Sequence, residues 1–185
     1  MGEHEYRLVG KGLRLVYRGE IIRIAFSLMM FLLETFYLPL LGFLGALGAA
    51  VGGLMALEGL NKAGDAHENY RAALTLLLTE RVFAIVSYVA GTSPVATVLT
   101  LLNSLFYVLA IYFICQTSGM LLWEKGEEKL ARRAGELWKV TLLCRTAETA
   151  LFAHEGLTFV LSLVSLVVLF LRLGFYMKAC RVLME

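Results

Sequence analysis

Proline, cysteine and charged residues are all scarce in this sequence. It has two prolines in 185 residues, so long helices can run without interruption. The three cysteines, Cys115, Cys144 and Cys180, form no CxxC pair, which excludes a disulfide framework and a cysteine-based zinc site. Charged residues make up 17%, below the share of about a quarter that is typical of soluble domains.

Motifs of enzyme active sites are also missing. The chain has no GxxxxGK[ST] phosphate loop, no HExxH and no GxSxG. His4, His67 and His154 are too few and too scattered for a haem or di-metal site, and His154 with Glu34 and Glu155 makes a poor metal site from two distant segments. We therefore expect no catalytic residue, no metal, no cofactor and no enzymatic activity. The net charge of +2 gives no reason to expect nucleic acid as a partner.

Apolar residues are abundant instead. They make up 59% of the chain, and the mean hydropathy is +0.73, which favours a protein whose outer surface faces lipid. Breaks at Pro39, Gly64, Gly91, Gly126 and Gly156 divide the chain into helical segments. Asp65 and Ser93 could cap the helices that follow them. The expected segments are roughly 5–37, 39–63, 65–90, 94–125, 127–154 and 157–183.

These segments predict an all-α, polytopic integral membrane bundle with six transmembrane helices arranged as three helical hairpins. The second, fourth and sixth segments contain about the 20 apolar residues that cross a bilayer. The fifth is the weakest, because four polar residues interrupt it: Arg145, Glu148, His154 and Glu155. Four spans with one or two helices lying on the surface are the alternative. We treat residues 1–185 as one transmembrane domain.

Lys and Arg cluster at alternate ends of the segments. Fifteen of the 17 lie near the chain start, near the turns at 58–71 and 123–139, or near the chain end. The turns at 37–40, 90–94 and 154–157 contain none. The positive-inside rule therefore predicts a multi-pass protein of the inner or plasma membrane with both termini in the cytoplasm. Residues 1–20 are expected to begin the chain as a cytoplasmic amphipathic helix.

The two exceptions, Arg81 and Arg145, fall near mid-membrane, as do Glu80 and Glu148. At 1.5 Å per residue, each arginine lies roughly 15 Å from the next turn, in a hydrocarbon core about 30 Å thick. Because charges at this depth normally pair or face water, we expect Arg81 to pair with Glu148, and Glu80 with Arg145. Such a network is either a binding or permeation site or a structural clasp that fixes helix register.

Small residues form a stripe in the second segment, and such stripes let helices approach closely in lipid. Its glycines are Gly42, Gly45, Gly48, Gly52 and Gly53. The stripe serves either packing inside the bundle or association with a second copy or another membrane subunit.

Two functions follow from these features. The first is a membrane protein that handles a small solute or ion, an unidentified small-molecule ligand, at the midplane charges. The second is a non-transporting membrane subunit or scaffold that oligomerises, or docks on a partner, through its glycine-rich helix.

Overall fold

The protein, described here from a computed structural model, is built of long helices, and no strand occurs in its described residues. The structure describes residues 2–35, 39–91, 93–150 and 155–185. The helices are α1 (Glu3–Thr35), α2 (Pro39–Gly64), α3 (Glu68–Ala90), α4 (Pro94–Glu124), α5 (Glu128–Ala150) and α6 (Glu155–Met184). The expectation of an all-α chain of six helices is confirmed, with ends within about four residues of the expected ones.

One of the two expected helix caps is confirmed. The Ser93 hydroxyl accepts a hydrogen bond from the Ala96 amide at 3.3 Å, at the start of α4. Asp65 does not cap α3, because that helix begins three residues later, at Glu68. His67 takes this place, since its Nδ1 accepts from the Asn69 amide at 3.2 Å. The carboxylate of Asp65 instead lies 3.7 Å from Arg71 Nη2.

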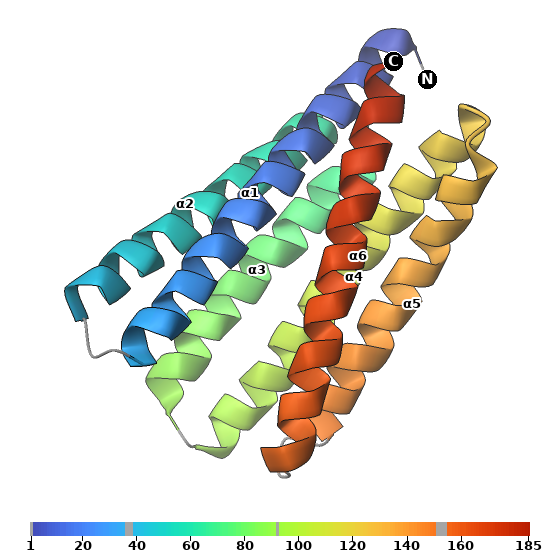
Figure 1. Cartoon of the computed structure of the whole chain (residues 1–185). Coiled ribbons are helices and arrows are strands. Elements are labelled where there is room, and N and C mark those ends of the chain that lie inside the picture. Colours follow the sequence, from blue (N-terminus) through green and yellow to red (C-terminus); the bar gives the residue numbers. More distant parts are fainter. Residues whose placement is uncertain (1, 36–38, 92, 151–154) are drawn as a thin grey trace.

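The helices form a closed ring in which each packs against its sequence neighbours and α6 returns to pack against α1 (Figure 1). The chain start and the chain end lie together at one end of the bundle. The α4–α5 turn lies at this same end, which we call the terminal end. Because α4 lies between α3 and α5, these two helices do not pack directly on one another.

Glycines on both helices bring α1 and α2 together. A Cβ atom added to Gly59 would lie 2.5 Å from the carbonyl oxygen of Gly12, and one on Gly52 would lie 2.5 Å from that of Gly19. Further along the same two helices, a Cβ atom added to Gly48 would overlap the ring of Phe26. The contact residues are seven apart on α1, and seven and then four apart on α2, so each set lies on one face of its helix and the two helices pack along a common seam.

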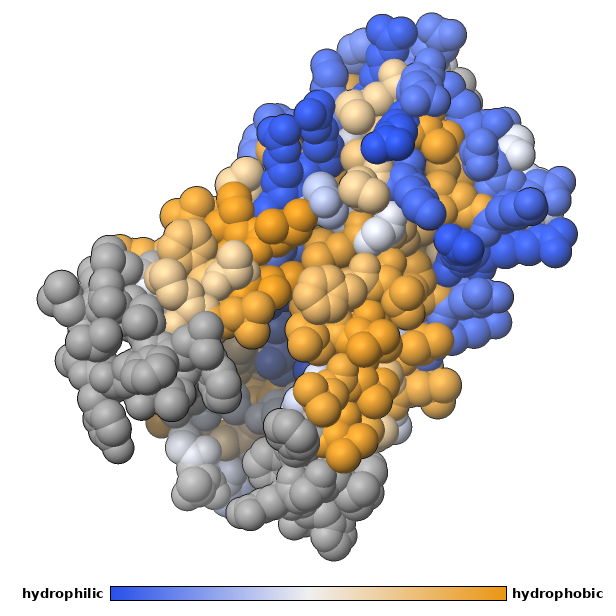
Figure 2. Space-filling view, in the orientation of Figure 1, coloured by the Kyte–Doolittle hydropathy of each residue, from blue (hydrophilic) through white to orange (hydrophobic). Residues whose placement is uncertain are grey.

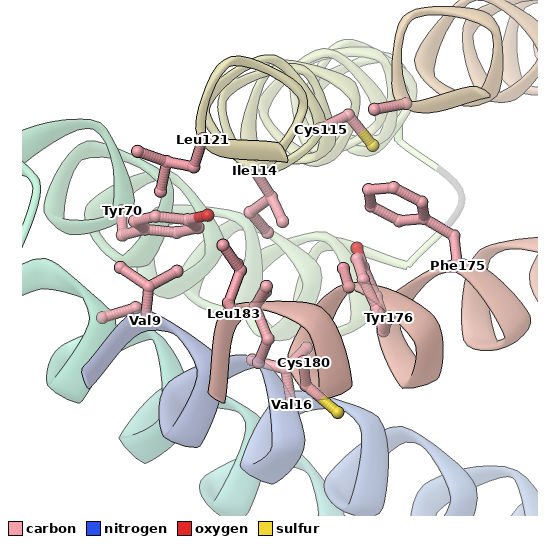
Figure 3. Close-up of a cluster of buried hydrophobic side chains, with 14 of the residues drawn as sticks. Val9, Val16, Tyr70, Ile114, Cys115, Leu121, Phe175, Tyr176, Cys180 and Leu183 are labelled. Carbon is pink, nitrogen blue, oxygen red and sulfur yellow. The ribbon is translucent and has the colours of Figure 1, made fainter. Parts of the chain in front are cut away.

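At the terminal end the molecule resembles a soluble helical bundle. Apolar side chains from every helix fill the interior, where Tyr70 donates or accepts a 2.7 Å hydrogen bond with Ser118 (Figure 3). Members of this core include Val9, Leu13, Leu60, Ala63, Leu121, Leu130, Ala134 and Leu183. Tyr6 Oη donates to Glu124 at 2.5 Å and lies beneath Lys125, which ties α1 to the α4–α5 turn. The Glu124 carboxylate raises the pKa of Tyr6 to about 12.

The other half of the bundle, which we call the apolar half, has the reverse distribution of surface residues. Its outer surface is apolar on all six helices, with Val89 79% exposed and Leu143 69% exposed. Figure 2 shows this change along the molecule, from a hydrophilic terminal end to a hydrophobic surface beyond it. Other exposed apolar side chains of this half are Leu28, Leu47, Val51, Leu54, Val82, Ile85, Val98, Leu101, Leu142, Val160, Leu163 and Val167.

Two helices are long and apolar enough to cross a bilayer among the residues that the structure describes. They are Pro94–Glu124 and Val160–Met184. The six-span arrangement is therefore not confirmed and stays a prediction. At 1.5 Å per residue, the 33 residues of α1 and the 31 of α4 reach about 45–50 Å, so each exceeds a hydrocarbon core of about 30 Å.

Candidate functional site

Six charged side chains of the apolar half form glutamate–arginine pairs, in which the glutamate is always the more buried partner. On α1, Arg23 Nη2 lies 2.6 Å from Glu20 Oε2. On α3, Arg81 Nε lies 3.2 Å from Glu80 Oε2, and on α5, Arg145 Nη1 lies 2.9 Å from Glu148 Oε2. Each pair belongs to a single helix, so each odd-numbered helix brings its own ion pair.

The expected pairing of α3 with α5 is wrong. The ion pairs that the structure describes at Glu80, Arg81, Arg145 and Glu148 run within one helix, because α4 separates α3 from α5. The amide of Asn103 on α4 faces Glu80, and with its nitrogen on that side it donates to Glu80 Oε1 at 3.1 Å. Coupling across the bundle is electrostatic, since Glu80 also interacts with the charge of Arg145.

Glu148 has a second partner on α6. The hydroxyl of Ser165 donates a short hydrogen bond to Glu148 Oε1, while Oε2 accepts from Arg145. Both carboxylate oxygens are therefore occupied, and the contact fixes α5 against α6 beside the arginine.

Arg172 on α6 is the most deeply buried charge of the site. Its side chain is 2% exposed, and its Nε has no hydrogen-bond partner among the described residues. The guanidinium lies 5.4 Å from the ring centre of Tyr107, and Arg145 lies 4.8 Å from the same ring. Tyr107 thus holds two arginines by cation–π contact. Glu20 interacts electrostatically with Arg172 as well as with Arg23.

These arginines line a pocket of about 270 Å³ between α1, α4, α5 and α6. Arg23, Arg145 and Arg172 all lie at its wall, with Tyr107. The remaining lining residues are Thr141, Cys144, Ser162, Ser165, Leu166, Val168 and Leu169. In Figure 2 the apolar face is hollowed between α1 and α6, and hydrophilic side chains show at the floor of the hollow. We call this space the arginine pocket.

A second, smaller cavity lies deeper in the ring. It measures about 30 Å³, the share of volume that one water molecule takes in liquid water, and its lining includes Glu20, Arg81, Tyr107 and Tyr176. Because Tyr107 and α1 border both spaces, the polar interior extends from Arg145 on α5 to Arg81 on α3.

Sequence reasoning missed Glu20, Arg23 and Arg172. Arg23 was assigned to the basic chain start and Arg172 to the basic chain end, by their distance along the chain. The residues that flank these three in the sequence are a better guide to their position than their distance from the chain ends. Arg172 follows sixteen uncharged residues from 156 to 171, and Glu20 and Arg23 are three residues apart in an otherwise apolar stretch.

The glycine stripe lies partly against α1 and partly toward the interior. Gly48 and Gly52 face α1, and Gly45 is buried. Gly53 has no neighbouring atom within 4 Å of an added Cβ and lines the small cavity. The surroundings of Gly42 lie outside the described residues. At the two closest positions the stripe therefore packs inside the chain.

In the part of the chain that the structure describes, no three His, Cys, Asp or Glu side chains lie close enough together to bind a metal ion. The side chains of Glu34, His154 and Glu155 lie outside that part.

Comparison with known proteins does not add a family to these observations. No protein-family model, no curated protein and no solved structure matches the chain.

Proposed function

We propose that this chain is a polytopic membrane protein that binds a small polar solute or ion in the arginine pocket and handles it within the bilayer. The observation that carries the proposal is the apolar half of the bundle, where the surface is rich in exposed apolar side chains while the buried Arg172 lies with Arg23 and Arg145 at the wall of a pocket. In lipid, ionisable side chains are rare and normally face the bundle interior or a water-filled cavity. A surface of exposed Val, Leu and Ile on six helices suits acyl chains.

The membrane orientation belongs to the same proposal. The terminal end has a hydrophilic surface and carries most of the basic residues, which supports a cytoplasmic location of both termini under the positive-inside rule. Helices longer than the hydrocarbon core would then cross the bilayer with their apolar halves. Their terminal halves would form a bundle in the cytoplasm.

The presence of a pocket distinguishes a ligand-binding function from a scaffold function. An interior without a cavity, in which every charge is paired, would support a purely structural role for these residues. The arginine pocket has room for several water molecules, at about 30 Å³ each, and Arg172 Nε is left without a partner among the described residues. The packing of α1 against Gly48 and Gly52 gives less support to the scaffold hypothesis, because these glycines of the stripe already have a partner within the chain.

Two adjacent positions on α5 test the proposal. Cys144 lines the arginine pocket, whereas Leu143 lies on the apolar exterior. The first variant carries Cys115→Ala and Cys180→Ala and keeps Cys144. The second carries Cys144→Ala and Leu143→Cys in addition. Both are treated in open membrane fragments with 2-sulfonatoethyl methanethiosulfonate, which is soluble in water and does not enter lipid.

We expect Cys144 to react and the cysteine at position 143 to stay protected by lipid. Protection at both positions would mean that the pocket is dry and would overturn the binding function. Equal, fast reaction at both positions would place the outer face of α5 in water and would overturn its membrane location.

A further inference from the structure

Among the side chains that the structure describes in the apolar half, arginines outnumber glutamates. Glu20, Glu80 and Glu148 each pair with an arginine of their own helix. Arg172 is the fourth arginine, buried on α6, and no ion pair to it occurs among the described residues. Glu20 interacts with Arg172 as well as with Arg23, so one carboxylate is shared between two arginines. A buried arginine that has only a shared carboxylate favours the binding of a further group of opposite charge beside it.

We infer that the arginine pocket binds a small oxyanion, a monocarboxylate or a phosphate monoester, with Arg172 as its counter-charge. This inference rests on the proposed function and names the class of its solute. Arg23, Arg145 and Arg172 reach the pocket from three different helices, so an anion placed among them would be contacted from several sides.

Guanidinium groups suit this ligand. The planar fork of an arginine donates two parallel hydrogen bonds to a carboxylate or phosphate, and it stays charged at any physiological pH. The Nε of Arg172, which has no partner among the described residues, supplies one such donor. The pocket volume of about 270 Å³ admits a small organic anion and is below the range of roughly 300–1,000 Å³ typical of drug-sized ligands.

A monoanion suits the pocket better than a dianion. Arg23 and Arg145 are already paired with Glu20 and Glu148 at 2.6 and 2.9 Å, and Glu20 also interacts with Arg172, so little positive charge is left to be neutralised. A dianion would add a second negative charge to a space that these carboxylates already border. Monocarboxylates should therefore bind more tightly than doubly charged phosphates at the same ionic strength.

The inference is tested by measuring whether a bound oxyanion protects the Cys144 thiol from chemical modification. The protein that keeps Cys144 alone is purified in a neutral detergent and treated with the uncharged reagent 2-hydroxyethyl methanethiosulfonate. Acetate, butyrate, methyl phosphate and inorganic phosphate are compared with chloride and with tetramethylammonium at constant ionic strength. At ten times its dissociation constant, a bound oxyanion should slow the reaction about tenfold by mass action.

Arg172→Gln should abolish this protection, whereas Arg132→Gln, on the exposed part of α5, should keep it. Equal rates in oxyanions and chloride would overturn the inference, as would equal protection by tetramethylammonium. Because these comparisons use the protein that keeps Cys144 alone and has the native Arg172, they decide the matter even if Arg172→Gln does not fold. Protection that persists in a folded Arg172→Gln protein would remove Arg172 from the site.

Two further outcomes separate the possibilities. If Cys144 does not react at all, the proposed pocket function fails. If it reacts without oxyanion protection, the pocket remains and the ligand class is wrong. Vesicles of phosphatidylcholine with and without phosphatidylglycerol identify the source of the anion. Protection confined to phosphatidylglycerol vesicles would assign the site to a lipid headgroup and would overturn binding of a free solute.

Discussion

At the scale of single residues, the apolar half of this protein depends on carboxylates that hold arginines. Glu148 shows this most directly, because one oxygen accepts from Arg145 and the other from Ser165 on α6. Removing its charge leaves the half-exposed Arg145 without this carboxylate partner. Ser165 on α6 also loses its hydrogen bond to a charged carboxylate, and such a bond is stronger than one between neutral groups.

We predict that Glu148→Gln lowers the free energy of unfolding by about 1–3 kcal/mol. Breaking a fully buried pair costs about 3–5 kcal/mol, and Glu148 is 22% exposed, so the cost here should be lower. The matched control is Glu128→Gln on the same helix. Its exposed pair with Arg132, at 3.6 Å, should be worth less than about 1 kcal/mol.

Unfolding of the purified proteins by denaturant in detergent micelles measures both values. Equal stability of Glu148→Gln and the parent would show that the carboxylate does not hold Arg145 in the folded protein.

At the scale of helices, close packing of α1 against α2 decides what the glycines of α2 do. The backbones of the two helices meet at Gly12 and Gly59, and at Gly19 and Gly52, where no side chain fits. Each contact brings a carbonyl oxygen near the opposite Cα, which is also the arrangement of small-residue helix pairs in membrane proteins. The glycines thus supply contact area within one chain.

Gly52→Ala and the adjacent Gly53→Ala should have opposite effects. A Cβ on Gly52 would lie 2.5 Å from the Gly19 carbonyl oxygen and 2.6 Å from the Arg23 amide nitrogen, so both backbones would have to separate. We expect a loss of about 1–3 kcal/mol, as for other overpacked interiors. At Gly53 the space is open, so the higher helix propensity of alanine should leave stability equal or raise it by up to about 1 kcal/mol.

Thermal unfolding of the two variants in the same detergent gives the comparison. A Gly52→Ala protein as stable as Gly53→Ala would mean that α1 and α2 do not touch at this position.

At the scale of the whole molecule, the ring of helices combines a soluble-type core with an inverted apolar half. The terminal end is filled with apolar side chains, whereas the polar interior begins near Glu20, Tyr107 and Arg172. If the apolar half lies in a bilayer, successive turns of the chain must face opposite sides of the membrane.

Single cysteines at three turns test this topology in a cysteine-free background. We predict that Asp65→Cys and Lys125→Cys react with an impermeant reagent from the cytoplasmic side, in inverted vesicles. Thr97→Cys, in the first turn of α4, should react from the opposite side, in spheroplasts. Reaction of all three from one side would contradict the crossing of the membrane by α3 and α4.

The sequence alone predicted the six helices, because Pro39, Gly91 and Pro94 interrupt helices by local backbone geometry. It also located four of the charges at the interior site, since a charge among apolar residues is visible in any linear reading. Helix ends and apolar stretches are properties of neighbouring residues, so no knowledge of the tertiary arrangement was needed.

Only the tertiary structure decided which groups meet. The placement of α4 between α3 and α5 separates Arg81 from Glu148, and the return of α6 to α1 brings Arg172 into the pocket with Arg23. These two arginines are 149 positions apart in the sequence. Their proximity depends on how six helices close into a ring, and helix packing of that kind leaves no local pattern in the chain.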